Sequence, residues 1–562
     1  MIDFDAPPIN SVIEILLRDM NSGGNILFNG KELTKKFLPK IKPRALKSAD
    51  EKILRTRTNA EVFTPSRVVK FMVDALDDGG QIDSRWLEIA CGEAPFLTNR
   101  YDAETGEEIP INQRVGILDR KLRNAKNLDE AKRAVKSIYG YELQGDSLLI
   151  ARANILLTFA ECIENFSESD LAEVAEIIAW NLFQFDGTKE PQPLFGEEII
   201  DWRIGRKFVF GGNTMKKFDF VIGNPPYHEE NSGDNKNFSS PVYNILMEQA
   251  QKVGEKVTLI TPARFLFDAG GTPKDFNKRM LSDTHLKVLK YEPTASESFK
   301  NVEIKGGVAI TIRDESKNYG AIGTFIPHKE LNSTHQKVCV DNENFQSLSK
   351  IVFGRTKYFL TKKFIEEHPD APFLDRKNDF FKSNVFKYAA DYFFDEKPND
   401  GHEYIQVCGV ENNNERATKF IRRDYIAISD NNLNFYKYKV LIPEANGSGN
   451  LYEVLSTPLV GSPLVGSTQT FISVGAFDTQ AEAEACLAYI KGKFCRAMLG
   501  ILKVTQHNPP QTWAKVPLQD FTADSDIDWT LPIPEIDKQL YKKYGLDDAE
   551  INFIETHVKA MA

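Results

Sequence analysis

The chain has 562 residues, of which 41% are apolar and 27% charged, and its net charge is −10. This balance is that of a globular protein and excludes the collagen-like, low-complexity and strongly disordered classes. It also counts mildly against nucleic-acid binding by the surface as a whole, so such binding needs a local basic patch. The length predicts roughly two to four domains.

The sequence carries no sign of a membrane, a secretory route or a metal. No run of 18 apolar residues exists, so a spanning helix is not expected. The start, MIDFDAPPIN, lacks the basic and apolar stretches of a signal peptide. The six cysteines are scattered, without Cys-x-x-Cys pairs or zinc spacing to histidines. We therefore expect a cytoplasmic protein with reduced thiols and no metal.

Residues 1–58 are predicted to form a helical segment that becomes basic towards its end. The stretch Lys31–Arg57 holds ten Lys or Arg against three Asp or Glu. A smaller basic stretch, Arg355–Lys363, has aromatic residues between its cations. Each stretch is either a phosphate-binding patch or a solvated helix face, and the sequence leaves both interpretations open.

Residues 59–325 alternate between helical patterns and short apolar strands. The predicted helices include SRVVKFMVDAL, LLIARANILLTFAECI and PVYNILMEQAQKV, and the predicted strands are RWLEIA, SIYGYEL, FDFVIG, KVTLIT, LKVLKYE and GGVAITI. This alternation predicts an α/β domain with a doubly wound, mainly parallel sheet. A polar insertion over about 98–136, rich in Asp, Arg and Lys, separates the first two strands.

Beyond this region the alternation fades, and a second domain is predicted. Residues 326–520 carry β-branched and aromatic clusters between Gly, Asn and Asp turns, which favours a separate α+β domain. Residues 521–562 have helical patterns. In GLDDAEINFIE an aspartate precedes an amphipathic run, as at a capped helix start.

The stretch VIGNPPYHEE ends an apolar strand with Asn224, Pro225, Pro226 and Tyr227. Neither proline can donate a backbone hydrogen bond, and Asn224 is held extended because a proline follows it. The corner therefore presents carbonyl oxygens, an amide oxygen and a flat aromatic ring. This inventory suits a planar group that carries two N–H donors.

Two other strand ends carry candidate ligand-binding residues. In WLEIACGEAPFL a strand ending near Glu88 leads into a turn with Gly92, and Ala94 stands where a second glycine is usual. The Ala94 methyl group fits there if the turn has an ordinary φ. In SIYGYELQGDSLLIARANILL the strand ends at Glu142, the position of an acidic residue that binds ribose hydroxyls. Each pattern alone also fits a surface turn or a helix cap.

A fourth pattern, EVFTPSRVVKFMV, places Phe-Thr-Pro before a helix. Thr64 is predicted at the capping position and Pro65 in the first turn. A helix start of this kind is a ready site for a carboxylate, but it is equally a plain helix cap.

The combination of these four patterns resembles the γ-ordered amino-methyltransferases of DNA, and most closely the methylases of Eco57I-type restriction–modification systems. The resemblance covers nearly the whole chain. It is carried by RWLEIACGEAPFL, IYGYELQGDSLLIARANIL, ITPARFLFDAGGTPKDFNKRML, IKGGVAI and FCRAMLGILKVTQH. It implies a site-specific DNA adenine-N6 methyltransferase of the class I fold. In that family a catalytic domain, here 59–325, precedes a target-recognition domain, here 326–520.

The resemblance implies S-adenosyl-L-methionine as the cofactor. The Phe-Thr-Pro segment would lie near its methionine part and Glu142 would accept its ribose hydroxyls. In WNLFQFDG we assign the adenine-binding acidic residue to Asp186, although Gln184 fits the spacing equally. The implied cofactor-binding residues are Phe63, Thr64, Pro65, Glu88, Ala90, Gly92, Phe96, Glu142 and Asp186.

The resemblance also gives the Asn-Pro-Pro-Tyr corner its chemistry. The Asn224 side-chain oxygen and the Pro225 carbonyl would accept the two hydrogens of adenine N6 and localise its lone pair, without a general base or a metal. The base must first be flipped out of the duplex. Tyr227 and Phe299 would stack on it. The implied catalytic residues are Asn224, Pro225, Pro226, Tyr227 and Phe299.

Double-stranded DNA is the expected partner, and a separate restriction endonuclease is a further one. We expect a monomer, because an asymmetric site is read by one recognition domain. The candidate DNA-binding residues of the recognition domain are Arg355, Lys357, Lys362, Lys363, Lys419, Arg422 and Arg423.

Three alternative functions remain open from the sequence. The first is a bifunctional enzyme that also cuts DNA, since HPDAPFLDRK partly resembles a nuclease signature, although its acidic spacing is short. The second is methylation of RNA or of a protein glutamine, which also uses Asn-Pro-Pro-Tyr. The third is a DNA-binding module without catalysis, against which the intact Asn-Pro-Pro-Tyr argues.

Overall fold

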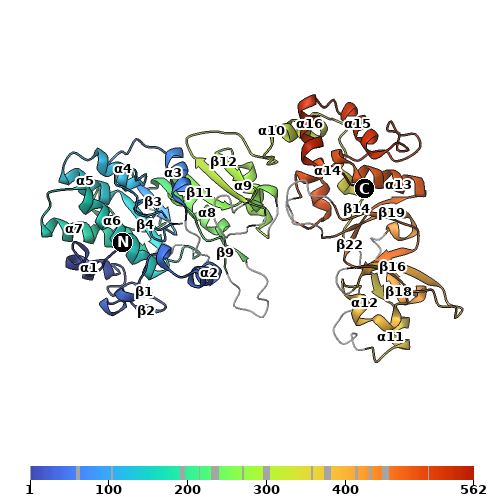
Figure 1. The fold of residues 1–562 in the computed structure, drawn as a ribbon, viewed down its shortest axis with the longest axis horizontal. Helices are drawn as coiled ribbons and strands as arrows, with labels where there is room; N and C mark the ends of the chain where they lie inside the picture. The colour runs from blue at the N-terminus through green and yellow to red at the C-terminus, as the bar shows by residue number, and fades with distance from the viewer. Residues whose placement is uncertain are drawn as a thin grey trace. The chain divides into compact units, whose positions relative to one another are not determined.

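The computed structural model divides into two compact units, Met1–Thr324 and Phe325–Ala562 (Figure 1). It describes residues 2–58, 64–102, 105–189, 196–213, 215–229, 240–268, 271–294, 304, 306–355, 358–371, 381–411, 415–428, 433–445, 455–503 and 506–561. The predicted division into four segments with separate roles stays a prediction.

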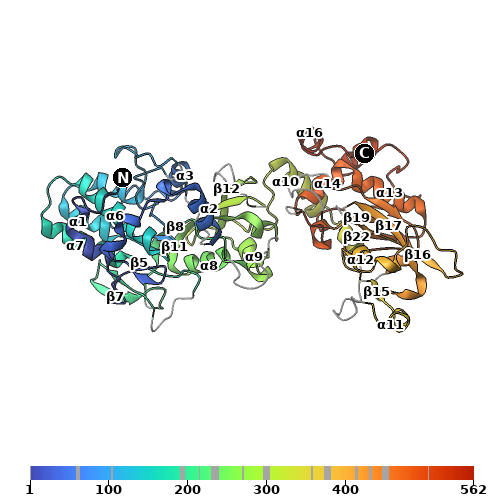
Figure 2. The same ribbon diagram turned by 60° about the horizontal axis from the view of Figure 1, so that its bottom comes forward.

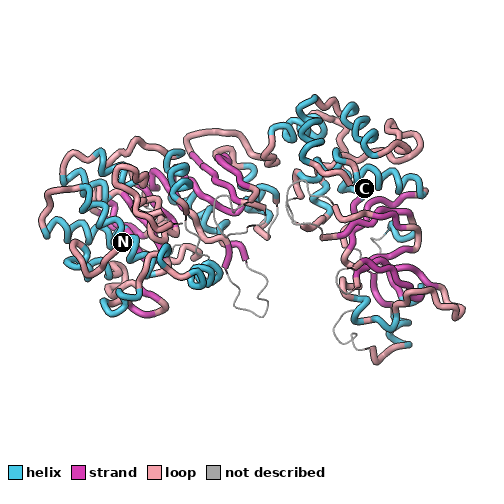
Figure 3. Tube along the Cα trace, viewed as in Figure 1, coloured by secondary structure: helices cyan, strands magenta, loops and turns pink. Residues whose placement is uncertain are grey.

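The first unit contains a central sheet with helices packed around it (Figure 3). Its described helices are α1 (Ile9–Leu17), α2 (Ala49–Thr58), α3 (Ser66–Ala75), α4 (Ile117–Asn124), α5 (Leu128–Lys136), α6 (Gly145–Cys162), α7 (Glu168–Asn181), α8 (Tyr243–Val253) and α9 (Lys274–Ser282). Its described strands are β1 (Leu27–Phe28), β2 (Lys31–Glu32), β3 (Trp86–Ile89), β4 (Ile138–Glu142), β5 (Leu182–Gln184), β6 (Glu198–Asp201), β7 (Arg206–Val209), β8 (Phe218–Gly223), β9 (His228–Glu229), β10 (Ser240–Pro241), β11 (Gly254–Pro262), β12 (Leu286–Glu292) and β13 (Val308–Asp314).

Seven of these strands form the central sheet, in the order β12-β13-β11-β8-β3-β4-β5. The neighbours from β11 to β5 pair in parallel, and β13 is antiparallel to both β11 and β12. Every residue of β3 is buried, and so are five of the six residues of β8, as expected when helices cover both faces of a parallel sheet. The predicted α/β, mainly parallel fold is confirmed.

The helices pack on this sheet in sequence-local groups. Helices α1, α6 and α7 contact one another, and α6 and α7 also contact β4 and β5 (Figures 1 and 2). Helix α8 packs against β8 and β11. All six strands predicted from apolar runs are present, as β3, β4, β8, β11, β12 and β13.

The insertion at 98–136 differs from the prediction of a polar segment, because its second half forms helices α4 and α5. Three apolar residues of α4 are buried, namely Ile117, Leu118 and Leu122. Three of α5 are buried as well, namely Ala131, Ala134 and Val135. The many charged residues between them made the segment look polar throughout. In the structure, the charged residues of α5 lie on the face opposite its buried residues.

The basic stretch Lys31–Arg57 is only partly a solvated surface. Lys47 and Arg55 are buried and both bind the carboxylate of Asp146, in the first turn of α6. Lys47 Nζ and Arg55 Nη1 each lie 2.9 Å from Asp146 Oδ2. These two cations therefore attach α2 and the segment before it to the sheet domain, while Lys31, Lys35, Lys36, Lys40 and Lys42 are exposed.

The second unit combines small sheets with helices (Figure 3). Its described helices are α10 (Lys329–His335), α11 (Lys362–Glu367), α12 (Val385–Tyr388), α13 (Gln480–Lys491), α14 (Lys493–Gly500), α15 (Ile533–Lys543) and α16 (Asp548–His557). Its described strands are β14 (Val352–Phe353), β15 (Tyr358–Leu360), β16 (Tyr404–Val410), β17 (Arg416–Arg422), β18 (Ile426–Ile428), β19 (Tyr438–Pro443), β20 (Leu459–Gly461), β21 (Val465–Ser467) and β22 (Phe471–Phe477).

Two hydrophobic cores organise this unit. One lies between the sheet β14-β22-β19-β20 and the C-terminal helices, and α13 packs against β19, β20 and β22. The other includes residues of β15, α11, α12, β16 and β17. Helix α16 begins as predicted, because the Asp547 side chain accepts from the N–H groups of Ala549 and Glu550.

We expect the buried Lys439 to make the stability of the second unit depend on pH. Its ammonium group, 1% exposed, donates to the carbonyls of Asn434, Phe435, Lys437 and Ser462. Burial lowers the pKa of Lys439 from 10.5 to about 8. Between these two values the unfolded chain binds the proton and the folded chain does not, so stability rises with pH.

The measurement is denaturant unfolding of this unit at pH 7 and pH 10. The free energy of unfolding should rise by roughly 2–3 kcal/mol more in the wild type than in Lys439→Met. Lys437→Met, which alters a half-buried lysine paired with Asp478, should keep the wild-type pH dependence. Equal pH dependence in the wild type and Lys439→Met would contradict the assignment.

Candidate active site

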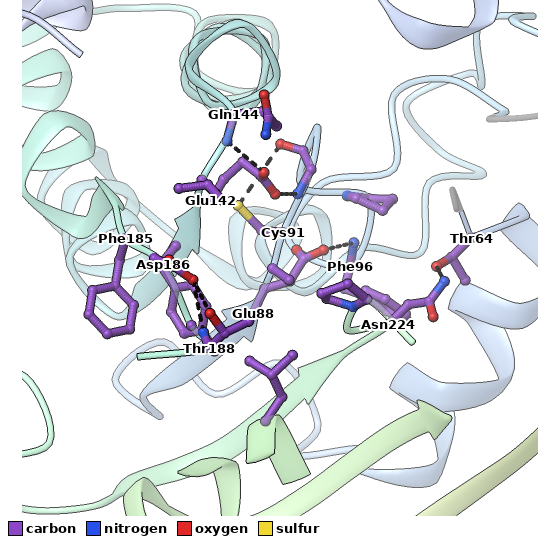
Figure 4. Close-up of a pocket in the computed structure, with 18 residues that line it drawn as sticks. Thr64, Glu88, Cys91, Phe96, Glu142, Gln144, Phe185, Asp186, Thr188 and Asn224 are labelled. Carbon is purple, nitrogen blue, oxygen red and sulfur yellow. Dashed lines mark hydrogen bonds between the residues drawn. The ribbon is translucent and has the colours of Figure 1, made fainter. Parts of the chain in front are cut away.

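A pocket lies at the carboxyl ends of the parallel strands, where α/β proteins bind ligands (Figure 4). It encloses about 820 Å³, part of it open to solvent. Residues at or just after the ends of β3, β4, β5 and β8 line it, together with Thr64 before α3 and Leu246 of α8. Four strand ends that are far apart in the sequence thus form one site.

The turn after β3 is tightly wound. Ala90, Gly92 and Ala94 all have left-handed backbones, with φ of 46°, 56° and 60°. The condition under which the Ala94 methyl group was expected to fit, an ordinary φ, is therefore not met. Its side chain is fully buried and takes a conformation that costs an alanine roughly 1 kcal/mol, so the surrounding structure holds the turn in a strained form.

Glu88 holds this turn from inside. Its carboxylate accepts from the backbone N–H groups of Leu97, at 3.0 Å, and Phe96, at 3.4 Å. Burial raises the pKa of Glu88 well above its ordinary value, against the opposing effect of these two hydrogen bonds. Glu88 also lines the pocket, so it both shapes the turn and contributes an oxygen to the pocket wall.

Glu142 joins the end of β4 to the same turn. Its Oε2 accepts from the Gly92 N–H and its Oε1 from the Gln144 N–H, both at 2.8 Å. A carboxylate oxygen can accept more than one hydrogen bond, so a ligand hydroxyl can share it with a backbone N–H. The backbone contacts fix the carboxylate beside Gly92, at the pocket wall (Figure 4).

Asp186 and Gln184, which the sequence could not separate, have different surroundings. Asp186 lines the pocket and accepts from the backbone N–H and the hydroxyl of Thr188. Burial alone would raise the pKa of Asp186, but hydrogen bonds from Thr188 and Lys189 bring it below its ordinary value. Gln184 instead bonds to the backbone of Leu27 and Leu143, so its amide is engaged in structure.

Asn224 follows β8 directly and lies beside Thr64 at the pocket wall (Figure 4). Its Nδ2 donates to Thr64 Oγ1 at 3.2 Å, which directs the amide oxygen away from Thr64. Gly223 permits this position, because a Cβ there would lie 2.7 Å from the carbonyl oxygen of Ile89. The asparagine is therefore held by strand packing on one side and a hydroxyl on the other.

The sequence predicted that Thr64 caps helix α3, but the structure shows that it does not. The N-cap residue is Pro65, and the cap has no side-chain hydrogen bond. The predicted helix start is thus one residue too early, and the Thr64 hydroxyl contacts Asn224 instead. Thr64 is buried and lines the pocket, whereas the pocket wall does not include Pro65.

The remaining residues of the Asn-Pro-Pro-Tyr corner are mostly buried. Pro226 lines the pocket, and Pro225 is buried behind it. Tyr227 is 6% exposed and belongs to the hydrophobic core of the first unit. Phe63, Phe299 and Lys357 lie outside the described residues.

Several pocket residues were not predicted from the sequence. Most of them lie at or just after a strand end, and that position is the signal by which the sequence could have identified them. Leu246 lies in the middle of a helix and has no such signal. The missed lining residues are Cys91, Pro95, Tyr141, Leu143, Gln144, Phe185, Gly187, Thr188 and Leu246.

Most of the candidate DNA-binding cations of the second unit are held by carboxylates. The pairs are Arg355–Glu444, Lys363–Asp424, Arg422–Asp424 and Arg422–Glu367, and Lys419 with Asp395 and Glu411. Arg423 donates to the Ile426 carbonyl and the Tyr436 hydroxyl. Lys362 is exposed and has no ion pair among the described residues. A phosphate would have to compete with these carboxylates for Arg355, Lys363, Lys419 and Arg422.

Neither a metal-binding cluster nor a membrane-spanning helix occurs among the described residues. No group of three or more His, Cys, Asp and Glu that could hold a metal ion occurs in the part of the chain that the structure describes. Within the same ranges, no helix is long and apolar enough to cross a membrane. Of the nuclease-like stretch, residues 372–377 lie outside the described ranges, and His368 contacts the Tyr425 hydroxyl at 3.0 Å.

The central sheet, with its pocket at the carboxyl strand ends, defines an α/β fold of the class I methyltransferase type. Residues 136–299 match the family model of the Eco57I restriction-modification methylase. The resemblance predicted from the motifs is therefore confirmed over this segment, and the match supports a methyltransferase of the restriction–modification class. The γ-class motif order stays a prediction.

The solved structures that match this chain have low sequence identity to it. The DrdV–DNA complex is 11% identical, with 90% of this chain and 58% of that chain covered and a TM-score of 0.42. The Type IIL enzyme MmeI in complex with DNA is 11% identical, covering 94% and 78%, with a TM-score of 0.38. A nuclease-deletion mutant of the Type ISP enzyme LlaGI with a DNA substrate mimic is 13% identical, covering 92% and 49%, with a TM-score of 0.39.

The chain spans about half the length of the first solved chains that it matches, with 46%, 58% and 49% of those chains covered. No curated protein matches this sequence.

Proposed function

We propose that this protein is a site-specific DNA methyltransferase that transfers a methyl group from S-adenosyl-L-methionine to adenine N6. The observation that carries the proposal is the position of Asn224. Its amide is fixed by Thr64 at the wall of the strand-end pocket, at the start of an Asn-Pro-Pro-Tyr corner. The match of residues 136–299 to a restriction-modification methylase family supports DNA as the substrate.

The pocket residues fit S-adenosyl-L-methionine chemically. Glu142 supplies a fixed carboxylate for ribose hydroxyls, next to the Gly92 turn. Phe185 supplies an apolar surface and Asp186 an acceptor in the same wall, which suits a planar base with an amino group. When bound, the cofactor supplies a methyl group on a sulfonium, which is already activated for transfer.

The chain's own residues prepare the nucleophile. The Asn224 side-chain oxygen and the Pro225 carbonyl accept the two N6 hydrogens of the target adenine. Two acceptors aimed at these hydrogens draw the nitrogen towards a tetrahedral geometry and localise its lone pair, which is otherwise delocalised into the ring. Such preorganised acceptors stabilise the charge that develops on N6 during transfer.

The target base reaches this position by leaving the duplex, at a cost of a few kcal/mol. Stacking on an aromatic ring returns roughly 1–3 kcal/mol per base. Tyr227 is the proposed stacking residue, and since its ring is buried in the core, the corner must rearrange locally when the base enters.

Single-molecule sequencing of DNA from cells that express the protein tests the proposed function. We expect N6-methyladenine at one fixed sequence context, and none in cells that express Asn224→Ala at the same level. Methylation at cytosine, or no methylated base with the soluble wild-type protein, would sink the DNA-adenine assignment. RNA and protein acceptors would then be tested with labelled S-adenosyl-L-methionine.

Glu142→Ala should weaken cofactor binding by about 10–100-fold, because it removes a charged acceptor from the proposed ribose site. Calorimetric titration with S-adenosyl-L-methionine measures this change. Gln184→Ala is the matched control: Gln184 bonds to the backbone of Leu27 and Leu143 and does not itself line the pocket, so cofactor affinity should change by less than about threefold. Equal losses in the two variants would contradict the role given to Glu142.

A further inference from the structure

The basic stretch near the N-terminus carries a group of exposed lysines. Residues 31–42 contain five lysines and one acidic residue, Glu32, in a chain whose net charge is −10. Lys35 pairs with Glu14 at 2.9 Å. The other four lysines are exposed and have no hydrogen bond or ion pair among the described residues. We call these four the lysine surface: Lys31, Lys36, Lys40 and Lys42.

The backbone that carries the lysine surface is fixed by buried neighbours. Leu33, Leu38 and Ile41 lie between the lysines in the chain, and all three belong to the hydrophobic core of the first unit. In the adjoining stretch, the buried ion pairs to Asp146 hold the chain as well. The lysine side chains therefore extend into solvent from a fixed scaffold, which lowers the entropy cost of placing them against a ligand.

The chain before the lysine surface is attached beside the strand-end pocket. The Leu27 N–H donates to Gln184 Oε1 at 2.6 Å, and the Leu27 carbonyl accepts from Gln184 Nε2 at 2.7 Å. The same Nε2 donates to the carbonyl of Leu143, which lines the pocket. Gly145 permits this approach, because a Cβ there would collide with the Leu27 carbonyl oxygen. Strand β1 therefore lies next to the pocket wall.

The chain after the lysine surface is attached to the turn that follows β3. The Arg44 N–H donates to Glu93 Oε1 at 2.6 Å. Glu93 is next to Gly92 in this turn, and both Gly92 and Pro95 line the strand-end pocket. The two attachments, at Leu27 and Arg44, thus lie at the carboxyl ends of the parallel strands. The lysine surface lies between them in the chain, on the side of the sheet that contains the pocket.

The charge of the lysine surface suits a phosphate backbone. Cations that neutralise phosphates release counterions, and this release supplies most of the non-specific affinity of proteins for DNA. In the second unit, four of the candidate DNA-binding cations are paired with carboxylates. A phosphate at the lysine surface has no such ion pair to break among the described residues. The first unit therefore offers the more available cations.

We propose that the lysine surface contacts the phosphate backbone of a DNA duplex whose target base enters the strand-end pocket. This inference rests on the proposed function and adds to it a DNA contact made by the first unit itself. Phosphate contacts set the position and orientation of a duplex without reading its sequence. The lysine surface thus holds the duplex beside the pocket, and sequence discrimination belongs to other residues.

The test is the salt dependence of duplex binding by the full-length protein. Fluorescence anisotropy with a labelled DNA duplex of mixed sequence compares the wild type with a fourfold variant, which carries Lys31→Gln, Lys36→Gln, Lys40→Gln and Lys42→Gln. Each phosphate contact contributes about 0.9 to the slope of log affinity against log salt concentration. We expect the steepness of this slope to decrease by about 2–4 in the fourfold variant, and the affinity at about 0.1 M salt to fall at least tenfold.

Two exposed lysines near the amino ends of the strands provide a control. Lys216 lies two residues before β8, and Lys126 follows α4, whose last residue bonds to the loop before β3. The double variant Lys126→Gln, Lys216→Gln should change the slope by less than about 0.5. The charge-matched double variant Lys36→Gln, Lys40→Gln should reduce its steepness by about 1–2. Thermal unfolding of each variant shows that it is folded.

The possible outcomes separate this inference from the proposed function. If the wild type methylates DNA and the fourfold variant keeps the wild-type slope, the inference is overturned while the proposed function stands. If the wild type neither methylates nor binds DNA, both fail. If the four substitutions weaken the binding of single-stranded RNA and leave duplex DNA binding unchanged, the lysine surface serves RNA, and the inference is overturned as well.

Discussion

Replacing Asn224 with alanine should lower the rate of methyl transfer by about 10²–10³-fold and leave cofactor affinity nearly unchanged. The side-chain oxygen is the proposed acceptor for an N6 hydrogen, and its contribution grows as charge develops on the nitrogen. Removing one preorganised group of this kind typically costs about 2.7–4 kcal/mol of transition-state stabilisation. The measurement is single-turnover transfer of labelled methyl groups to DNA, with cofactor binding titrated separately.

Two further variants separate acceptance of the hydrogen from positioning of the amide. Asn224→Asp keeps an acceptor oxygen and should lose no more than about tenfold in rate, since a carboxylate also accepts from an amino group. Thr64→Val removes the group that receives the Asn224 Nδ2 hydrogen, at 3.2 Å, without touching the acceptor. It should lower kcat by about tenfold and leave KM for DNA unchanged. A loss in Asn224→Asp as large as in Asn224→Ala would contradict the acceptor role.

The sequence predicted the strands and the corner well, because both depend on local patterns. Apolar runs located β3, β4, β8 and β11, and the two prolines after Asn224 are incompatible with continuing a strand. Glu142 could be placed at a strand end before the structure, and the structure puts its carboxylate at the pocket wall. Its role in binding ribose stays a prediction.

Local patterns could not show features that depend on distant partners. The left-handed φ of Ala94 is imposed by the turn around Glu88. Alanine rarely adopts this conformation, so the residue type gives no sign of it. Gln184 and Asp186 have similar spacing from the strand, and only contacts with Leu27 and Thr188 separate them. Charged residues usually lie at the surface. For this reason neither the helices of the insertion at 98–136 nor the burial of Lys47 and Arg55 could be predicted from the sequence.

Asp146→Ala should be among the most destabilising substitutions in the first unit. The carboxylate lies between Lys47 and Arg55, and all three residues are more than nine-tenths buried. Removing it leaves two buried cations without their partner, which typically costs about 3–5 kcal/mol. Chemical denaturation of the first unit should show this loss in its free energy of unfolding.

A matched surface pair provides the control for burial. Glu14 and Lys35 approach to 2.9 Å but are largely exposed, so Glu14→Ala should cost less than about 1 kcal/mol. The triple variant Lys47→Met, Arg55→Met, Asp146→Leu replaces the buried charges with apolar groups and should recover most of the loss. A loss of less than 1 kcal/mol in Asp146→Ala would show that solvent reaches the cations.

Acidification provides an independent measure of the same interaction. Burial alone would raise the pKa of Asp146, but Lys47 and Arg55 hold it below its ordinary value of 3.8. The charged carboxylate therefore stabilises the fold above pH 3.8, and this contribution is lost as pH falls towards the lower folded-state pKa. The difference in unfolding free energy between wild type and Asp146→Ala should be constant above about pH 5 and shrink below pH 3.8. A difference that stays constant through this acidic range would mean that the two cations do not stabilise the charged carboxylate.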